Sequence, residues 1–293
     1  QYAVVGNPVK HSKSPRIHSL FASQTGMDLA YTAIQLKPEN FEAGVRKFFA
    51  DGGAGLNVTV PFKEKAFLLA DSCSERASLA QAVNTLCVDG DGALIGDNTD
   101  GVGLVRDIKG NHQFQIRQRR ILLLGAGGAV RGALSALVAE DPAEITIANR
   151  TPGKALQLKA EFGHLADLTA VGFGELDATA FDLVINGTSL GLEGKLPPIS
   201  KAVISSACCC YDMVYADSDT VFVRWARDNG AVLALDGLGE IERGLHDAAR
   251  AAALVAAAAE ELDRERQIDR ALDVVAVIAR SEGARENSAT KYA

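Results

Sequence analysis

The stretch of sequence that decides the fold is Arg119-Arg120-Ile121-Leu122-Leu123-Leu124-Gly125-Ala126-Gly127-Gly128-Ala129. Its apolar run predicts a buried strand, its glycines predict a tight turn, and the residues after them predict a helix. Glycines let the backbone approach a pyrophosphate closely, and the free N–H groups at the start of a helix bind negative charge. We therefore predict that a dinucleotide cofactor binds on Gly125, Ala126, Gly127, Gly128 and Ala129. The alternative is a plain tight turn between a strand and a helix.

The end of the next predicted strand, residues 144–148, indicates which dinucleotide binds. An NAD-dependent protein carries an acidic residue about 20 residues past the loop, where it binds the ribose 2′-hydroxyl. Arg150 stands there instead, flanked by Asn149 and Thr151, with Lys154 one helical turn further on. A guanidinium favours a 2′-phosphate through paired charge-assisted hydrogen bonds, so the sequence predicts NADP. The alternative is that Thr151 only caps the following helix and Arg150 is a solvated charge.

Short apolar runs alternate with helical patterns from the first residues to about residue 235. This alternation predicts an α/β fold with parallel strands and right-handed crossovers. The predicted strands are residues 3–5, 31–35, 55–60, 83–88, 93–95, 121–124, 144–148, 181–186, 208–214 and 231–235. The predicted helices are residues 14–24, 41–50, 63–69, 101–108, 129–139, 152–162 and 220–229. Residues 83–95 are a predicted hairpin, residues 110–113 a candidate linker, and residues 245–282 an alanine-rich, charged helical region.

Composition limits the class of protein. The length of 293 residues suggests two domains, and the net charge of −7 argues against a nucleic-acid-binding protein. Five cysteines, three of them adjacent at positions 208–210, predict reduced thiols in the core of a cytosolic protein. No apolar run reaches the roughly 18 residues that span a membrane, and the first residues predict a strand rather than a signal peptide. No metal site is predicted.

Four short polar patches in the first hundred residues form a second set of candidates. They contribute Ser12, Ser14, Thr59, Lys63, Asn84 and Asp100. Ser12 and Ser14 lie at a predicted helix start, a suitable place for a carboxylate, although Ser14 followed by Pro15 also predicts a simple helix cap. Together the hydroxyls, amide, ammonium and carboxylate suit a small polyhydroxylated acid, because a site built to bond hydroxyls discriminates strongly.

The chain resembles the shikimate dehydrogenase family, of the bacterial NADP-dependent type, over roughly residues 2–239. The matching motifs, in the family's order and spacing, are Ser12-Lys13-Ser14-Pro15, residues 57–63, 82–85, 98–103, 125–129, 149–151, 186–189 and 211–215, and Asp236-Gly237-Leu238-Gly239. The resemblance implies a substrate domain of residues 1–100 plus 238–293, with a mostly parallel sheet. It also implies a Rossmann-type, doubly wound NADP domain of residues 101–237, with the active site in the cleft between the domains.

The implied reaction is the reversible, NADP-dependent reduction of 3-dehydroshikimate to shikimate, a step of aromatic amino acid biosynthesis in the cytoplasm. Lys63 and Asp100 would be the catalytic pair. The implied substrate residues are Ser12, Ser14, Thr59, Lys63, Asn84, Asp100 and Tyr215. The implied cofactor residues are Gly125, Ala126, Gly127, Gly128, Ala129, Asn149, Arg150, Thr151, Lys154, Thr188, Met213, Gly237 and Glu75. The expected partner is the small-molecule substrate, with neither nucleic acid nor membrane, and the chain would be a monomer or a homodimer.

After residue 239 the sequence departs from the family's pattern. Gly244 stands where the family has a substrate-contacting glutamine, and Glu240 and Glu242 would lie near anionic ligands. Three hypotheses follow: an active enzyme with weakened substrate contact, a catalytically weak NADP(H)-binding relative or sensor, and a quinate/shikimate-type dehydrogenase. The intact pair of Lys63 and Asp100 favours the first hypothesis, and Arg150 disfavours the third.

Overall fold

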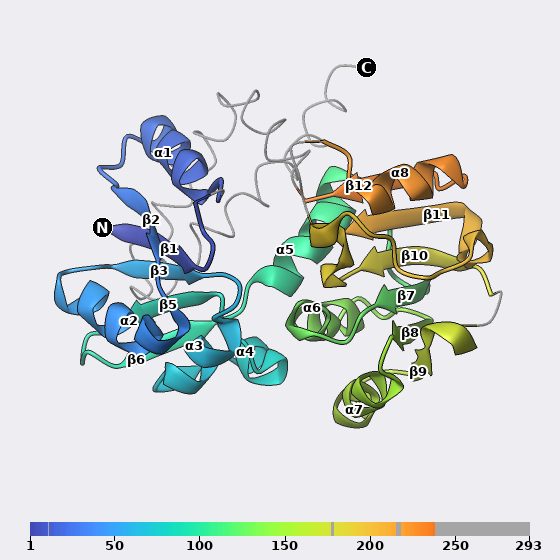
Figure 1. Ribbon diagram of the computed structural model, residues 1–293, viewed down its shortest axis with the longest axis horizontal. Coiled ribbons are helices and arrows are strands. Elements are labelled where there is room, and N and C mark those ends of the chain that lie inside the picture. Colours follow the sequence, from blue (N-terminus) through green and yellow to red (C-terminus); the bar gives the residue numbers. More distant parts are fainter. Residues whose placement is uncertain (11, 177–178, 215–217, 238–293) are drawn as a thin grey trace, which may run out of the picture. The chain divides into compact units, whose positions relative to one another are not determined.

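The computed structural model describes residues 1–10, 12–176, 179–214 and 218–237, which divide into two compact units (Figure 1). The first unit runs from Gln1 to Gly103, and the second begins at Leu104. The boundary falls inside helix α5 (Asp100–Arg106), which continues as a π-helical turn over Asp107–Asn111. The predicted linker at residues 110–113 therefore lies inside the second unit. The predictions made for residues 238–293 lie outside the described residues.

The first unit is built on a six-stranded sheet in the order β2-β1-β3-β5-β6-β4. The strands are β1 (Tyr2–Gly6), β2 (Tyr31–Gln35), β3 (Gly55–Val58), β4 (Ser72–Cys73), β5 (Thr85–Val88) and β6 (Leu94–Asp97). Strand β1 pairs in parallel with β2 and β3, and β4 pairs in parallel with β6. Strand β5 runs antiparallel to both β3 and β6, which confirms the predicted hairpin.

Helices lie on both sides of this sheet. They are α1 (Ser14–Thr25), α2 (Phe41–Ala50), α3 (Lys63–Leu69) and α4 (Glu75–Ala80), with α1 on one face and α2 and α3 on the other (Figure 1). The prediction that Ser14 caps α1 is wrong. The helix begins at Ser14 itself, Lys13 is the N-cap residue, and the Ser14 N–H is instead accepted by Ser12 Oγ at 3.3 Å. Pro15 lies in the first turn, where its missing N–H costs no hydrogen bond.

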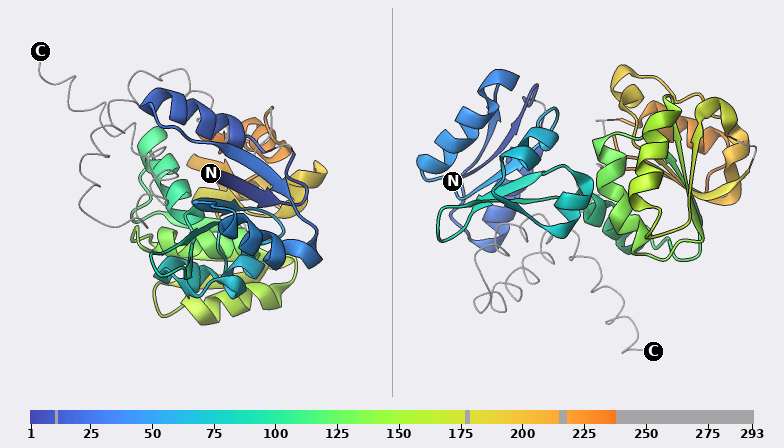
Figure 2. Two further views of the ribbon diagram at one scale, coloured as in Figure 1. Left: turned by 90° about the vertical axis from the view of Figure 1, so that its left-hand side faces the viewer. Right: turned by 90° about the horizontal axis from the view of Figure 1, so that it is seen from below.

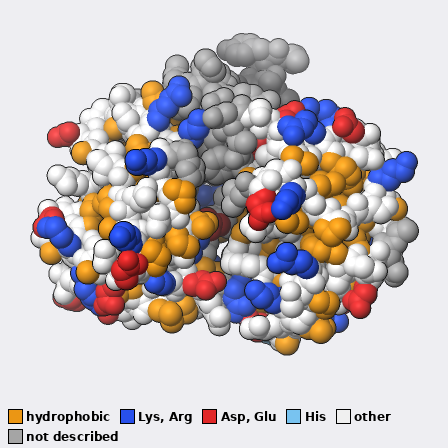
Figure 3. Space-filling model, viewed as in Figure 1, with side chains coloured by type: hydrophobic (Ala, Val, Ile, Leu, Met, Phe, Trp, Pro, Cys, Tyr) orange, Lys and Arg blue, Asp and Glu red, His pale blue; other side chains and the backbone are white. Residues whose placement is uncertain are grey.

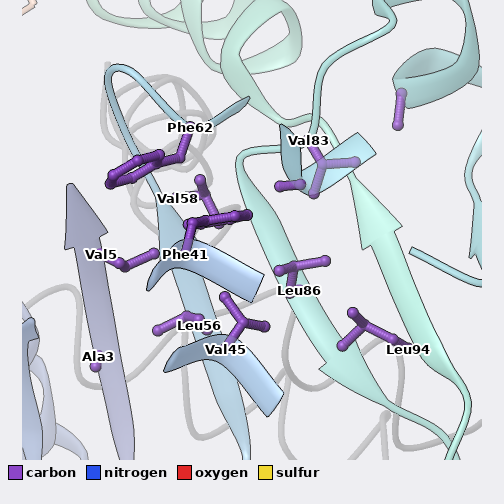
Figure 4. Close-up of a cluster of buried hydrophobic side chains, with 12 residues drawn as sticks. Ala3, Val5, Phe41, Val45, Leu56, Val58, Phe62, Val83, Leu86 and Leu94 are labelled. Atoms are coloured by element: carbon purple, nitrogen blue, oxygen red, sulfur yellow. The ribbon is translucent and has the colours of Figure 1, made fainter. Parts of the chain in front are cut away.

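The core of the first unit lies between α2 and the sheet. Figure 4 shows Phe41 and Val45 of α2 beside Leu56 and Val58 of β3, within one buried cluster. The Phe41 ring stacks on that of Phe62, with the ring centroids 4.6 Å apart. Each such buried side chain stabilises the fold by about 1.5–3 kcal/mol. Phe62 directly precedes Lys63, so its packing fixes the point from which α3 starts.

The second unit is a parallel sheet of six strands in the order β12-β11-β10-β7-β8-β9. The strands are β7 (Arg120–Leu124), β8 (Glu144–Asn149), β9 (Leu168–Gly172), β10 (Phe181–Asn186), β11 (Ile204–Asp212) and β12 (Leu233–Asp236). Numbered within the unit, this order is 3-2-1-4-5-6, the doubly wound order of dinucleotide-binding folds. The order reverses between β7 and β10, and the loops that follow those two strands are therefore where a ligand is expected.

Helices cover both faces of the second sheet as well. They are α6 (Gly128–Val138), α7 (Pro152–Phe162) and α8 (Val221–Asp228), with α6 and α7 on one face and α8 on the other (Figure 2). The side chains of Cys208, Cys209 and Cys210 in β11 are fully buried. All five cysteines of the chain are free thiols and four are buried, which confirms their predicted place in the core.

The sequence pattern missed two strands and one α-helix of the described chain. Strand β4 has two residues and helix α4 has six, so neither is long enough to show a periodic apolar pattern. Strand β9 lies at the edge of its sheet and buries only Leu168 and Gly172. Edge strands carry few buried side chains and therefore resemble loops in sequence.

Charged side chains of both signs are mixed on one face of the described protein. On the face shown in Figure 3, lysine and arginine lie interspersed with aspartate, glutamate and hydrophobic side chains in the described part of the chain. Such a surface differs from the continuous basic face that binds nucleic acid. Within the same residues, none of the helices has the length and apolar character needed to cross a bilayer.

Candidate active site

Lys63 and Asp100 form an ion pair in the first unit. Lys63 is the first residue of α3, and Asp100 is the first residue of α5. The Lys63 Nζ ammonium donates a hydrogen bond to Asp100 Oδ2. The two side chains are 28% and 24% exposed, so the protein holds the pair while a small molecule can still reach it. A positioned ammonium of this kind can exchange a proton with a bound ligand.

Asn84 orders the carboxylate of this pair. Its Nδ2 donates to Asp100 Oδ1 at 2.8 Å and to Thr99 Oγ1 at 3.0 Å. Its Oδ1 accepts the backbone N–H of Thr99 at 3.0 Å. Asn98 adds two further bonds, since its Oδ1 accepts the Asp100 N–H at 3.1 Å and its Nδ2 donates to the Ala82 carbonyl at 3.0 Å. Both carboxylate oxygens of Asp100 are therefore held by donors, and Asp100 stays in place as an acceptor.

An ion pair between the half-buried Arg76 and the buried Asp97 anchors the start of the same loop. Arg76 donates to both carboxylate oxygens of Asp97, and Ser74 Oγ donates to Asp97 Oδ1. Burial alone would raise the pKa of Asp97, but the hydrogen bonds from Arg76 and Ser74 outweigh it and the pKa is lowered. Asp97 Oδ1 also accepts the N–H of Asn98 at 2.7 Å, so this ion pair fixes the segment that leads to Asp100.

A chain of hydrogen bonds connects Ser12 and Ser14, at the start of α1, with Asn84. It runs through Ser12, Ser14, Tyr31, Asn57, Thr85 and Asn84. Ser12 Oγ donates to Ser14 Oγ at 3.2 Å, and the Ser14 hydroxyl bonds the Tyr31 hydroxyl, whose pKa is raised by burial. The Tyr31 hydroxyl donates to Asn57 Oδ1 at 2.6 Å. Five of the predicted substrate residues are thus brought into one bonded set, and Thr59, half-buried, lies two residues beyond Asn57.

The glycine loop of the second unit has the shape that a pyrophosphate requires. Gly125 has a φ of +108°, and a Cβ there would lie 3.1 Å from the Gly187 carbonyl oxygen, so only glycine fits. A Cβ at Gly127 or Gly128 would meet no atom within 4 Å, so the space above the loop is open. Gly127 is the N-cap residue of α6. The free N–H groups at the start of that helix are suited to binding an anion. These residues fit the phosphate groups of a dinucleotide.

The predicted 2′-phosphate residues lie together after β8. Arg150, Thr151 and Lys154 are exposed, and Asn149 Nδ2 donates to the Thr151 carbonyl at 2.9 Å. Thr151 is the N-cap residue of α7, but its side chain makes no capping hydrogen bond. Its hydroxyl therefore remains available to a ligand, beside two cations. This arrangement fits the NADP prediction better than the alternative in which Thr151 serves only as a cap.

Thr188 and Met213 both hydrogen-bond Asn186, the last residue of β10. Thr188 Oγ1 donates to Asn186 Oδ1 at 2.8 Å, and the Met213 N–H donates to the Asn186 carbonyl at 2.9 Å. Asn186 is buried and also donates to Asp212 Oδ1 at 3.0 Å. Burial raises the pKa of Asp212, although hydrogen bonds from Thr220, Val214 and Asn186 oppose the shift.

Several predicted residues stand apart from these two groups, and several contributors were missed. Gly237 follows β12, Glu75 is exposed in the first turn of α4, and Tyr215 lies outside the described residues. Sequence reasoning gave no role to Tyr31, Asn57, Arg76, Thr85 and Asp97. Asn57 and Thr85 lay inside quoted motifs, whereas Tyr31 and Arg76 gave no signal that could have found them. Among the described residues, no three His, Cys, Asp or Glu side chains gather as metal ligands do.

The glycine loop, the strand order and the hydrogen-bonded lysine–aspartate pair are together typical of a dinucleotide-dependent α/β oxidoreductase. Residues 4–86 match the family model of the shikimate dehydrogenase substrate binding domain, and residues 108–192 match that of shikimate / quinate 5-dehydrogenase. The chain is 55% identical over 239 residues to the shikimate dehydrogenase (NADP(+)) of Alkalilimnicola ehrlichii, covering 82% of this chain and 88% of that one. The chain belongs to the shikimate dehydrogenase family.

Solved structures agree with this assignment. The Ael1 enzyme from Pseudomonas putida is 44% identical, with a TM-score of 0.76 over 86% of this chain and 90% of that one. Shikimate 5-dehydrogenase from Thermus thermophilus, solved in complex with NADP(H) and shikimate, is 29% identical. Its TM-score is 0.71 over 87% of this chain and 92% of that one. The same fold therefore extends over most of both chains.

Proposed function

We propose that this protein is an NADP-dependent shikimate dehydrogenase, which reversibly reduces 3-dehydroshikimate to shikimate by hydride transfer. The observation that carries the proposal is the Lys63–Asp100 ion pair, held by Asn84, in a chain of the shikimate dehydrogenase family. An ammonium held beside a carboxylate is the group that a carbonyl reduction needs, because the oxygen must gain a proton as it is reduced.

Lys63 acts as the general acid in reduction and as the general base in oxidation. The carbonyl oxygen becomes negative as hydride arrives, and the Lys63 ammonium stabilises that charge and then donates a proton. Asp100 Oδ2 accepts a hydrogen bond from Lys63 Nζ, and Asp100 Oδ1 accepts one from Asn84 Nδ2. Asn84 therefore fixes the carboxylate, and the carboxylate fixes the position of the ammonium. NADP(H), when bound, supplies or accepts the hydride.

The remaining polar residues of the first unit bind and orient the substrate. Ser12 and Ser14 bind its carboxylate at the start of α1, and Thr59, Asn84 and Tyr215 bind its ring hydroxyls. The support is chemical: the serine hydroxyls lie together at a helix start, and Asn84 contacts the carboxylate of the reacting pair. Substrate binding belongs in this proposal to residues 1–100 with 238–293, and cofactor binding to residues 101–237.

The second unit binds NADP. Gly125, Ala126, Gly127, Gly128 and Ala129 hold the pyrophosphate, because the loop leaves open space above the N-terminus of α6. The 2′-phosphate is bound by Asn149, Arg150, Thr151 and Lys154, three of which are exposed. Thr188, Met213 and Gly237 lie along the nicotinamide, and Glu75 is a further cofactor contact. The enzyme acts as a monomer or homodimer in the cytoplasm, in the biosynthesis of aromatic amino acids.

The test is an assay of purified protein with 3-dehydroshikimate, in which NADPH oxidation is followed by absorbance. We expect turnover with NADPH, at least tenfold weaker turnover with NADH, and preference for shikimate over quinate in the reverse direction. Binding of NADPH without any turnover would support the alternative of a catalytically weak relative. Equal rates with quinate and shikimate would support a quinate/shikimate-type enzyme.

A further inference from the structure

Thr85 lies at the centre of the first unit's polar network, and the reaction gives it no role. It is the first residue of β5, where it faces Asn57 of β3 on one side and Asp97 of β6 on the other. Thr85 is only 3% exposed, so a bound ligand would contact the neighbours of Thr85 rather than the Thr85 hydroxyl. The hydroxyl accepts a hydrogen bond from Asn57 Nδ2 at 3.4 Å and donates one to Asn84 Oδ1 at 2.9 Å.

The direction of these hydrogen bonds follows from two groups that each have only one role: the Thr99 N–H, which only donates, and the Asp100 carboxylate, which only accepts. A backbone N–H can only donate, so the atom of Asn84 that faces the Thr99 N–H at 3.0 Å must be its oxygen. A carboxylate can only accept, so the atom of Asn84 that faces Asp100 at 2.8 Å must be its nitrogen. Both groups therefore fix the same orientation of the Asn84 amide.

The orientation of Asn84 determines that of Asn57 through Thr85. The single hydroxyl proton of Thr85 is directed at Asn84 Oδ1, which leaves only oxygen lone pairs for Asn57. Asn57 must then turn its Nδ2 toward Thr85, and its Oδ1 accepts the Tyr31 hydroxyl at 2.6 Å. Without Thr85 the orientation of the Asn57 amide would not be fixed, because Asn57 is only half-buried and the Tyr31 hydroxyl can either donate or accept.

We propose that Thr85 is a positioning residue, whose hydroxyl transmits the amide orientation set at Asp100 and Asn84 across the sheet to Asn57. The reacting pair and the polar residues that lead to Ser12 and Ser14 are thereby ordered together before substrate arrives. Pre-ordered polar groups bind a polar substrate more tightly, because no free energy is spent on turning them. The inference rests on the proposed function, since it assigns Thr85 to the same substrate site.

Three substitutions of Thr85 distinguish the contribution of its hydroxyl from that of its methyl group. Thr85→Val keeps the shape and removes the hydroxyl, Thr85→Ser keeps the hydroxyl, and Thr85→Ala differs from Thr85→Ser by the hydroxyl alone. For Thr85→Val we expect kcat/KM for shikimate to fall about tenfold, the usual effect of removing one hydrogen bond from the network. The KM for NADP should stay within about twofold, and Thr85→Ser should retain at least half of the wild-type kcat/KM. Thr146→Val, at a buried threonine of β8, is the matched control and should leave the shikimate kinetics unchanged.

The outcomes are separable. If Thr85→Val folds with wild-type kcat/KM, or if Thr85→Ser loses as much as Thr85→Val, the hydroxyl does not position the site and the inference is wrong. If Thr85→Val does not fold, the comparison of Thr85→Ala with Thr85→Ser decides in the same way. A second readout needs no activity: in spectra of asparagine-labelled protein, the side-chain amide signals of Asn57 and Asn84 should shift in Thr85→Val but not in Thr146→Val. An inactive wild type whose amide signals respond in this way would contradict the proposed function and support the positioning role.

Discussion

Replacement of Asp100 by asparagine tests the reacting pair most directly. The wild-type carboxylate accepts from Lys63 Nζ on one oxygen and from Asn84 Nδ2 at 2.8 Å on the other. An asparagine has one oxygen and one NH₂ group, so one of these two donors must face another donor. If the NH₂ group faces Lys63, the ammonium loses its partner; if it faces Asn84, the buried amide network is broken. Either arrangement displaces Lys63 from the position in which it transfers a proton.

The magnitude follows from the bond that is lost. A hydrogen bond to a charged group contributes about 1.5–3 kcal/mol, which corresponds to roughly 10–150-fold in rate. Misplacement of a general acid costs about 10²–10⁴-fold. We therefore expect kcat for shikimate oxidation to fall about 10²-fold or more in Asp100→Asn, with the KM for NADP within about twofold. A partly exposed ion pair contributes at most about 1 kcal/mol to stability, so loss of the ion pair alone should change the melting temperature little.

The assay is steady-state shikimate oxidation followed by NADPH absorbance, with a thermal melt of each variant. The control is Asp71→Asn, which alters a carboxylate of the same unit that accepts the Leu94 N–H at 2.7 Å. It should affect stability rather than kcat. The double variant Lys63→Ala/Asp100→Asn should be no slower than Lys63→Ala, because Asp100 acts through Lys63. A kcat of Asp100→Asn within threefold of wild type, or fully additive losses in the double variant, would refute the assigned roles.

Four further predictions concern Lys63, Arg150, Gly125 and His18. Lys63→Ala should lower turnover by about 10²–10⁴-fold with little loss of NADP affinity by calorimetry; unchanged turnover would exclude it as the acid. Arg150→Gln should weaken NADP binding about tenfold or more and leave NAD binding unchanged, so an equal loss for both cofactors would contradict its contact with the 2′-phosphate. Gly125→Ala should abolish measurable NADP binding and lower the melting temperature, because its φ of +108° disfavours any side chain. His18 stacks on Tyr31, and burial lowers the pKa of His18 from 6.5 to about 4. Between those pH values the unfolded chain binds more protons than the folded chain, so stability should fall by up to about 3 kcal/mol as the pH drops through that window. His18→Phe should flatten this dependence in melts from pH 7 to pH 4, and a slope equal to that of wild type would mean that His18 is not its source.

The sequence predicted the second unit well because its signals are local. The turn at Gly125 is specified by the strand before it and the helix after it, and a single glycine at a positive φ settles the conformation. Strands β7, β8 and β10 likewise show in the sequence as short runs of mostly apolar residues. The placement of Arg150 then follows from the length of one βαβ unit.

The first unit was harder to predict because its site depends on distant pairings. Asn57 and Thr85 lie 28 positions apart in the chain and Tyr31 and Asn57 lie 26 apart, so their bonds exist only once β2, β3 and β5 have paired. Arg76 was missed because α4 is too short to show a pattern. The cap assigned to Ser14 was wrong by one residue: the helix begins at Ser14 itself, and the Ser12 hydroxyl accepts the Ser14 N–H.

The reactivity of the three adjacent cysteines of β11 can report how often the second unit opens. Their side chains are fully buried, and β11 is shielded on its two edges by β10 and β12. Cys208 and Cys210 lie in one buried cluster with Phe222 and Ala226 of α8, so a thiol reagent reaches them only when that packing opens. The buried Cys87 belongs to the other unit. The rate of thiol modification therefore reports separately on how often each unit opens, and ligands that bind only one unit can be recognised by which thiols they protect.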